Sequence, residues 1–273
     1  MKILHPNHKD PLTLDELKNY LKHGIYDIID VKKRKKLNYF LQCFESYREK
    51  NNLVITEENL YENLPFSMHT DEWKERQKDI AIIDKKIGNT QNLKVLDVGS
   101  WNGWLSNYLT KKGHQVTALN LFIDEYDGLL AKNKYKLEFT SIQIQVEELY
   151  RIQDNFDLII FNRNWAYFIN HQKVFNDAKS KLTKNGEIIF TGLAVYKNTT
   201  KVRANLKYLN NKFHEKYNIP LIYNQSKGYL DYNDIEFFRK NEIKLNSYQR
   251  LKNIIKFFFP KKPKIYFGTY KMK

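Results

Sequence analysis

The chain has 273 residues, enough for one α/β domain with an appendage. It contains no long uncharged apolar run and one cysteine, Cys43, so we expect no transmembrane span, no signal peptide, no internal disulfide and a cytoplasmic location. The net charge of +15 comes mainly from dispersed lysines, and the scattered arginines form no recognition stripe, so the charge argues only weakly for RNA binding.

The first segment, residues 1–40, is predicted to be a small separate module. Its residues 3–12 resemble the start of a short zinc-ribbon-like module, with His5 and His8 where the first ligand pair would stand. A structural zinc site needs four ligands, and His23 is the one candidate near the place of the second pair. We therefore predict a degenerate module without metal, and a zinc site is the alternative.

The next segment, residues 41–90, is predicted to be a helical linker or lid. Apolar residues recur at helical spacing after the basic run 32–36, which we interpret as a solvated turn. A second helix is predicted over residues 72–86, capped by Thr70 or Asp71.

A tight glycine turn between a buried strand and a helix is predicted in residues 94–106. Gly99 and Gly103 suit places where the backbone turns sharply, and backbone N–H groups in such a turn suit polar or anionic ligand groups. Asp97, at the carboxyl end of the strand, would face the crevice where open α/β sheets bind ligands. Trp101 stands where the dinucleotide motif G-x-G-x-x-G has its second glycine, which argues against a dinucleotide. A turn without a ligand is the remaining alternative.

After this motif the sequence alternates strands and helices, as βαβ units do. Strands are predicted at residues 115–120, 138–145, 156–162 and 187–192, helices from near Gly103, Asp124 and Asn170, and a final hairpin at 242–247 and 265–271.

Four stretches carry further motifs: Gly99 to Ser106, Gly113 to Asn120, Asp127 to Leu129 and Phe156 to Asn162. They resemble the G-x-G-N-G-W-L-S, G-H-x-V-x-x-x-D, D-G-L and F-D-L-x-I-F-N runs of class I S-adenosylmethionine (SAM) methyltransferases. The resemblance is to the type 11-like bacterial branch with a zinc-ribbon-like module in front. It implies an α/β fold with a Rossmann-like seven-stranded sheet and helices on both faces. It places the methyltransferase domain at residues 91–273, with an insertion at about 200–232, and implies SAM as the cofactor.

The resemblance also implies a set of cofactor-binding residues, and no metal ligand. They are Asp97, Gly99, Ser100, Trp101, Gly103, Asn120, Leu121, Gln145, Val146 and Asn162. Asn120 and Gln145 depart from the family, because acids normally hold the ribose hydroxyls and the adenine amine there. An amide lacks the charge-assisted bond, so each change is expected to cost about 1–3 kcal/mol of cofactor binding. Trp101 is expected to crowd the cofactor.

Methyl transfer from SAM depends mainly on positioning the acceptor. Tyr167 and His171 follow the fourth predicted strand, where substrates enter in this family, and are the candidate catalytic residues. The alternative for both is a packing or surface role.

We predict a SAM-dependent methyltransferase that acts on a small-molecule, glycan or lipid-precursor acceptor. The two amides favour a first alternative, a catalytically weak or inactive protein that acts by binding or regulation. The charge favours a second, an RNA methyltransferase. The stretch 250–264 mixes Lys with Ile and Phe, so we also consider a peripheral contact with the inner face of a membrane.

Overall fold

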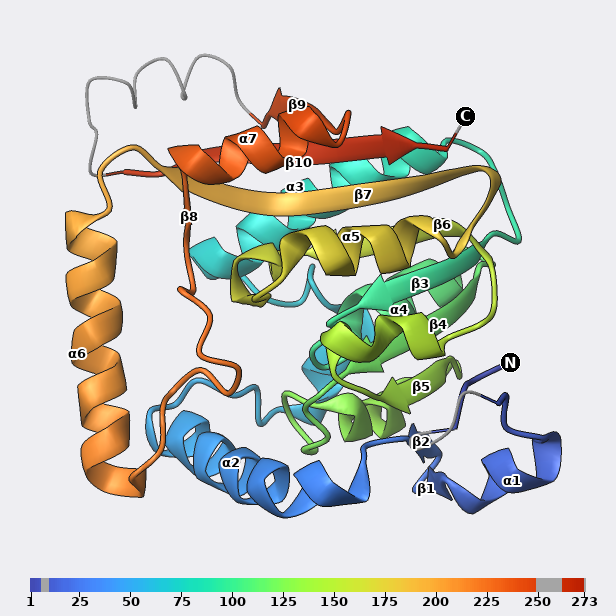
Figure 1. Cartoon of the computed structure of the whole chain (residues 1–273), viewed down its shortest axis with the longest axis horizontal. Helices are drawn as coiled ribbons and strands as arrows, with labels where there is room; N and C mark the ends of the chain where they lie inside the picture. Colours follow the sequence, from blue (N-terminus) through green and yellow to red (C-terminus); the bar gives the residue numbers. More distant parts are fainter. Residues whose placement is uncertain (6–9, 249–261, 273) are drawn as a thin grey trace.

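The computed structural model of the chain describes residues 1–5, 10–248 and 262–272 (Figure 1). Its strands form one sheet in the order β1-β2-β5-β4-β3-β6-β7-β10-β9, with β8 beside β7. The strands are β1 (Leu21–Lys22), β2 (Ile25–Asp27), β3 (Lys94–Val98), β4 (Gln115–Asn120), β5 (Thr140–Gln143), β6 (Phe156–Asn162), β7 (Leu182–Tyr196), β8 (Leu230–Asp231), β9 (Lys244–Ser247) and β10 (Lys264–Lys271).

The strands from β2 across to β7 are parallel, and β10 runs antiparallel between β7 and β9. From β3 the chain moves to β4 and β5 on one side, then crosses to β6 on the other. Open α/β sheets bind ligands outside the carboxyl ends of the strands at such a reversal of direction. The topology therefore places the functional edge at the ends of β3, β4 and β6.

Helices cover both faces of the sheet. The α-helices are α1 (Leu14–Asn19), α2 (Val31–Lys50), α3 (Asp71–Ile87), α4 (Trp104–Lys111), α5 (His171–Lys179), α6 (Thr200–Tyr217) and α7 (Tyr232–Lys240). Short 3-10 helices are η1 (Glu58–Asn63), η2 (Leu129–Lys134), η3 (Val146–Arg151) and η4 (Trp165–Tyr167).

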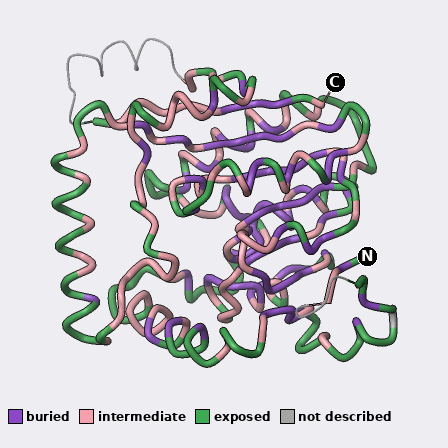
Figure 2. The backbone as a smooth tube through the Cα atoms, viewed as in Figure 1, coloured by how far each residue is buried: buried purple, intermediate pink, exposed green. Residues whose placement is uncertain are grey.

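Two apolar clusters form the core, one on each face of the sheet. Side chains alternate along β3, so Leu96 and Val98 join the cluster with α5 and α7, and Val95 joins the cluster with α3 and α4. Figure 2 shows the buried residues concentrated along the central strands, whereas α6 is mostly exposed or half-buried. Phe213 is the residue of α6 that is buried.

The sheet has ten strands in the described residues rather than the predicted seven, because β1, β2 and β8 are added to it. These additions are two or three residues long, too short to show an alternating pattern in the sequence.

Two local predictions were wrong. The chain does not start a helix near Asp124, because the Asp124 carboxylate accepts the backbone N–H groups of Tyr126 and Asp127 and closes a turn. The basic run 32–36 is not a turn, since it lies in α2, whose N-terminus is capped by the side chain of Asp30.

The N-terminal segment is joined to the main sheet. β2 pairs in parallel with β5, and Ile3 forms a bridge with Ile152. The buried Arg151 guanidinium donates to the carbonyls of Leu4 and Ile28, at 3.2 and 2.7 Å. The boundaries of the predicted module (1–40), linker (41–90) and domain (91–273) stay predictions.

Three further expectations concern metals and membranes. Within residues 1–5, 10–248 and 262–272, no group of three or more His, Cys, Asp or Glu side chains could hold a metal ion, and His8 lies outside these ranges. Over the same residues, no helix is long and apolar enough to cross a membrane. Most of the stretch 250–264, considered for membrane contact, lies outside the described residues.

Candidate active site

The end of β3 and the turn after it form the centre of the site. Asp97 is 1% exposed and accepts a hydrogen bond of 2.8 Å from the hydroxyl of Ser106 in α4. Burial raises the pKa of the Asp97 carboxyl to about 7, against the opposing effect of that hydrogen bond. Gly99 has φ +69°, and a Cβ there would clash with the side-chain amide of Asn164, so this turn requires glycine.

Trp101 is held against α3. Its indole stacks on Trp73, with ring centroids 5.7 Å apart and an interplanar angle of 18°. The guanidinium of Arg76 lies 4.8 Å from each of the two rings, and that of Arg48 lies 5.7 Å from Trp101. Trp73 and Arg76 are three residues apart and share one face of α3, which explains how one helix supplies both contacts. Each cation–π contact is worth about 0.5–2 kcal/mol.

Two cavities meet at this turn. One, of about 470 Å³, extends from the ends of β3, β4 and β5 to α2 and α6, and we call it the apolar cavity. The other, of about 410 Å³, lies between α3, the end of β3 and the end of β6, and we call it the polar cavity. Both volumes suit a small-molecule ligand. The residues that line both cavities are Gly99, Trp101, Asn164 and Tyr167.

Most of the predicted cofactor residues line one of these cavities. Asp97, Ser100 and Asn162 line the polar cavity, and the apolar cavity is lined by Asn120, Leu121, Gln145 and Val146. The Trp101 indole forms a wall of both cavities and fills neither, so space remains beside Asp97 and beside Asn120.

Two predicted residues lie elsewhere. Gly103 begins α4 with φ +77°, and a Cβ there would come within 2.7 Å of the ring of Phe139, so its role is close packing. His171 does not occur among the described residues that line either cavity. Its ring stacks on Trp165 at 4.9 Å and its Nε2 lies 2.9 Å from the Trp165 carbonyl. Tyr167, by contrast, lies where the two cavities meet.

The cavities contain buried polar atoms that fit a polar ligand. Over the described part of the chain, Ser100 Oγ, Asp127 Oδ1 and Asn164 Oδ1 are buried and make no hydrogen bond. Each of these residues lines a cavity. Buried polar atoms in proteins are nearly always paired, so these three are suitable positions for the polar groups of a bound molecule.

The amide at position 120 has a local cause. Asn120 Nδ2 donates to the carbonyl of Trp101 at 3.0 Å, and Oδ1 accepts from the N–H of Leu121 at 2.9 Å. Trp101 has φ 53°, and its carbonyl oxygen points to the end of β4. An ionised carboxylate accepts hydrogen bonds but donates none, so an aspartate at position 120 would face that carbonyl oxygen without a hydrogen between them. Tryptophan in the turn and asparagine on the strand are therefore compatible with one another.

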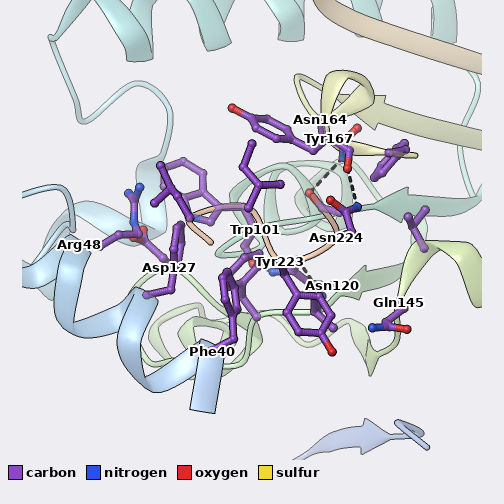
Figure 3. Close-up of a pocket in the computed structure, with 18 of the residues that line it drawn as sticks. Phe40, Arg48, Trp101, Asn120, Asp127, Gln145, Asn164, Tyr167, Tyr223 and Asn224 are labelled. Carbon is purple, nitrogen blue, oxygen red and sulfur yellow. Dashed lines mark hydrogen bonds and ion pairs between the residues drawn. The ribbon is translucent and has the colours of Figure 1, made fainter. Parts of the chain in front are cut away.

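Gln145, the second amide, links the site to α2. Lys33 Nζ donates to Gln145 Oε1 at 3.2 Å and also pairs with Glu148. Tyr223 lies on the same wall of the apolar cavity, next to Phe40 of α2, with ring centroids 5.1 Å apart (Figure 3).

A buried carboxylate, that of Asp79, holds two residues that line the polar cavity, Asn162 and Arg163. Asp79 of α3 is fully buried and accepts two hydrogen bonds from Arg163, at 2.5 and 3.2 Å. It also accepts from Asn162 Nδ2 at 3.0 Å and from the Tyr248 hydroxyl at 2.5 Å. The neighbouring carboxylate raises the pKa of Arg163, although burial opposes this. Asn162 is thus fixed by a protein network at the edge of the cavity.

Several residues of the site were missed in the sequence. No prediction was made for Arg48, Arg76, Asp79 and Asn164, although Asn164 is the second residue after the predicted fourth strand. The spacing of Trp73 and Arg76 was a usable signal, since residues three apart share a helix face. Arg48 and Asp127 are 79 positions apart, and their ion pair arises from the packing of α2 on the loop after β4.

The strand order, the glycine turn after β3 and the cavities at that turn define a class I methyltransferase fold. Residues 96–190 match the methyltransferase domain family, in agreement with the predicted class of enzyme. No curated protein matches the chain.

Solved methyltransferase structures share this fold. The plantazolicin methyltransferase BpumL, in complex with SAH, has a TM-score of 0.50 and 13% identity, over 89% of this chain and 97% of that chain. A putative sarcosine dimethylglycine methyltransferase from Galdieria sulphuraria has a TM-score of 0.52 and 11% identity, over 84% and 98%. Phosphoethanolamine N-methyltransferase 2 from Haemonchus contortus, in complex with SAM, has a TM-score of 0.50 and 12% identity, over 84% and 60%. At these identities the likeness shows the fold, and the predicted α/β class is confirmed.

The contact between Asn120 and Trp101 gives a first testable prediction. We expect Asn120→Asp to lower the free energy of unfolding at pH 8 by about 1–3 kcal/mol, because the new carboxylate faces a carbonyl oxygen. Urea unfolding followed by circular dichroism measures this change.

Asn246→Asp is the matched control, since Asn246 also donates to a backbone carbonyl, that of Lys244, but is exposed. We expect its effect to stay within about 0.5 kcal/mol. Equal stabilities of the two variants would contradict the explanation given for the amide at position 120.

Proposed function

We propose that this protein transfers a methyl group from SAM to a small-molecule, glycan or lipid-precursor acceptor. When bound, SAM would supply an activated methyl group. A lone pair of the acceptor would form the new bond to the methyl carbon, and the electron pair of the broken carbon–sulfur bond would stay on sulfur. The acceptor's proton is then released. The observation that carries this proposal is the meeting of a polar and an apolar cavity at Gly99, because SAM has a charged amino-acid end and a nucleoside end.

The polar cavity suits the amino-acid end of SAM. It contains groups of both signs: Arg76 and Arg163 for a carboxylate, Asp97 and Glu72 for an ammonium or sulfonium. Arg76 is paired with Glu72 at 2.9 Å, and burial lowers the pKa of its guanidinium, which nevertheless stays charged at neutral pH.

The ends of β4 and β5 suit the nucleoside end. Leu121 and Val146 offer apolar surface, and Asn120 keeps one amide hydrogen and one lone pair for the ribose hydroxyls after its protein bonds are made. Gln145 is in a position to meet the adenine edge. These roles follow from the family resemblance and remain part of the proposal.

Tyr167 is the proposed acceptor-positioning group. It lies where the cavities meet and is 47% exposed. Partial desolvation raises the pKa of its phenol further above neutral, so at neutral pH the hydroxyl keeps its proton and can donate a hydrogen bond to the acceptor. His171, the other candidate, contributes through Trp165, on which it stacks.

Two further parts of the proposal are the branch of the methyltransferase family and the location of the protein in the cell. We place the chain in the bacterial type 11-like branch with a degenerate, metal-free module over residues 1–40. We also place it in the cytoplasm, with a peripheral membrane contact through 250–264 as an additional hypothesis. The weakly active or regulatory alternative is favoured by one observation: neither Asn120 nor Gln145 supplies a charge to the nucleoside.

Isothermal titration calorimetry with SAM tests the proposal, and the variant Arg76→Met tests the role of the Arg76 guanidinium in binding. We expect the wild-type protein to bind SAM and Arg76→Met to bind it about 10-fold or more weakly, because methionine keeps much of the stacking volume but cannot pair with a carboxylate.

Arg239→Met is the matched control, because Arg239 also pairs with a glutamate on its own helix but its side chain is 76% exposed. We expect its SAM affinity to equal that of the wild type. Absence of wild-type binding at millimolar SAM would overturn the proposed function in favour of the regulatory alternative.

A further inference from the structure

The apolar cavity continues well past the nucleoside end of the proposed SAM site. Beyond Asn120 and Gln145 it is bounded by side chains from α2, α6 and the segment after α6. Those with purely hydrocarbon side chains are Phe40, Phe44, Leu206, Leu209, Leu221 and Ile222. Figure 3 shows Phe40 on this wall, with Tyr223 beside it and Arg48 and Asp127 further along.

α6 and α2 form this part of the cavity together. The Tyr39 hydroxyl of α2 donates to the Tyr217 carbonyl of α6 at 3.1 Å. Phe213 of α6 packs its ring on Tyr47 of α2, with centroids 5.3 Å apart. In Figure 1, α6 runs from the end of β7 down to α2, so the two helices enclose the space between them and the strand ends.

The described lining of this cavity carries few charges, and one ion pair accounts for two of them. They belong to Arg48, Asp127 and Glu147. Arg48 pairs with Asp127, and Glu147 accepts a hydrogen bond from Asn224 at 3.3 Å. Burial raises the pKa of Asp127 to about 6, and Arg48 opposes that rise, so the pair is ionised above this pH. A charge placed among the phenylalanine and leucine side chains, away from Arg48, Asp127 and Glu147, would lose its hydration without gaining a partner.

We propose that the space between α2 and α6 binds the methyl acceptor, and that the acceptor is a neutral molecule with a largely hydrocarbon body, such as an alkylphenol. Its nucleophilic atom lies next to Tyr167 and Asn164, and its apolar body lies under Leu206 and Leu209. The aromatic wall suits a ring, which packs edge-on or offset against phenylalanine. This inference rests on the proposed function, which it deepens by naming the class of substrate.

Binding of 4-heptylphenol tests this inference, with and without SAH. Heptylamine, heptanoate and glucose serve as cationic, anionic and polar comparison probes, and quenching of tryptophan fluorescence reports occupancy because Trp101 lines the cavity. We expect 4-heptylphenol to bind at least about 10-fold more tightly than the other three. Tighter binding of heptylamine, heptanoate or glucose would overturn the inference.

The variant Leu209→Trp tests whether 4-heptylphenol binds in the space between α2 and α6. We expect this variant to bind 4-heptylphenol about 10-fold or more weakly, since the larger side chain fills the cavity, while its SAM affinity and melting temperature change little. Tyr208→Trp is the matched control, because Tyr208 is the preceding residue of α6 and is 55% exposed. Undiminished heptylphenol binding by Leu209→Trp would overturn the proposed location.

Failure of the wild type to bind SAM would instead overturn the proposed function. The two failures can be told apart, since heptylphenol binding is also measured without cofactor.

Discussion

Asp97→Asn is expected to stabilise the fold at pH 8 while weakening SAM binding. The folded state raises the pKa of Asp97 from 3.8 to about 7, so the ionised form is disfavoured on folding. For a group of this kind stability is lost as pH rises from about 4 to about 7, and the loss is complete above that range. The neutral asparagine avoids the loss. Relative to wild type, the variant should therefore gain on the order of 2–4 kcal/mol between pH 4 and pH 8.

Asp97→Asn is expected to lower the affinity for SAM, although it raises the free energy of unfolding. In the proposed SAM site an ionised Asp97 attracts the positive end of the cofactor, so wild-type affinity should rise as pH increases through 7, whereas the affinity of Asp97→Asn should not. At pH 8 we expect at least about 10-fold weaker SAM binding by the variant, and a smaller difference at pH 6. Urea unfolding and SAM titration at pH 5, 6, 7 and 8 measure both quantities.

Ser106→Ala provides the control. Its hydroxyl lowers the pKa of Asp97, so its removal should move the pH midpoint of SAM binding upward without abolishing binding at pH 9. If Asp97→Asn binds SAM as tightly as the wild type at pH 8, Asp97 does not contact the cofactor. If its stability follows the wild-type pH dependence, Asp97 does not titrate near neutrality.

Asp79→Ala is expected to destabilise the protein by about 3–5 kcal/mol, because it removes the buried member of an ion pair and leaves Arg163 with one more distant carboxylate, Glu75 at 3.8 Å. Arg163, Asn162 and the Tyr248 hydroxyl would all lose an acceptor. These residues come from β6, from the loop after it and from the segment after β9, so the variant should loosen the edge of the polar cavity as well. Thermal and urea unfolding measure the loss.

Asp15→Ala is the control, since Asp15 also pairs with a cation, Lys18, but its side chain is 91% exposed. We expect its effect to be within about 0.5 kcal/mol. Asp79→Asn separates charge from shape: it should recover part of the stability through its remaining carbonyl acceptor but not the ion pair with Arg163. Equal stability of Asp79→Ala and wild type would show that Arg163 finds another partner.

The sequence predicted the main strands after Lys94 well, because apolar runs and glycine turns have strong local signatures. It predicted the helices less well, since α6 and α7 had no prediction and no helix starts near Asp124. The strand before Gly99, the strand ending at Asn120 and the strand ending at Asn162 all lie where their patterns placed them. Local signals failed where a side chain replaced a backbone partner, as Asp124 does in its turn.

The sequence by itself determined the class of fold and the edge of the sheet where the two cavities lie, since these follow from local periodicity and from residues within one turn. The tertiary structure decided the rest of the site. The orientation of Trp101 depends on Trp73 and Arg76 of α3, and the extent of the apolar cavity depends on α2 and α6. These contacts join residues far apart in the chain, and no local pattern records which helix packs against which strand end. The physical reason is that packing is decided by the shape and charge of surfaces that exist only once the sheet and its helices have assembled.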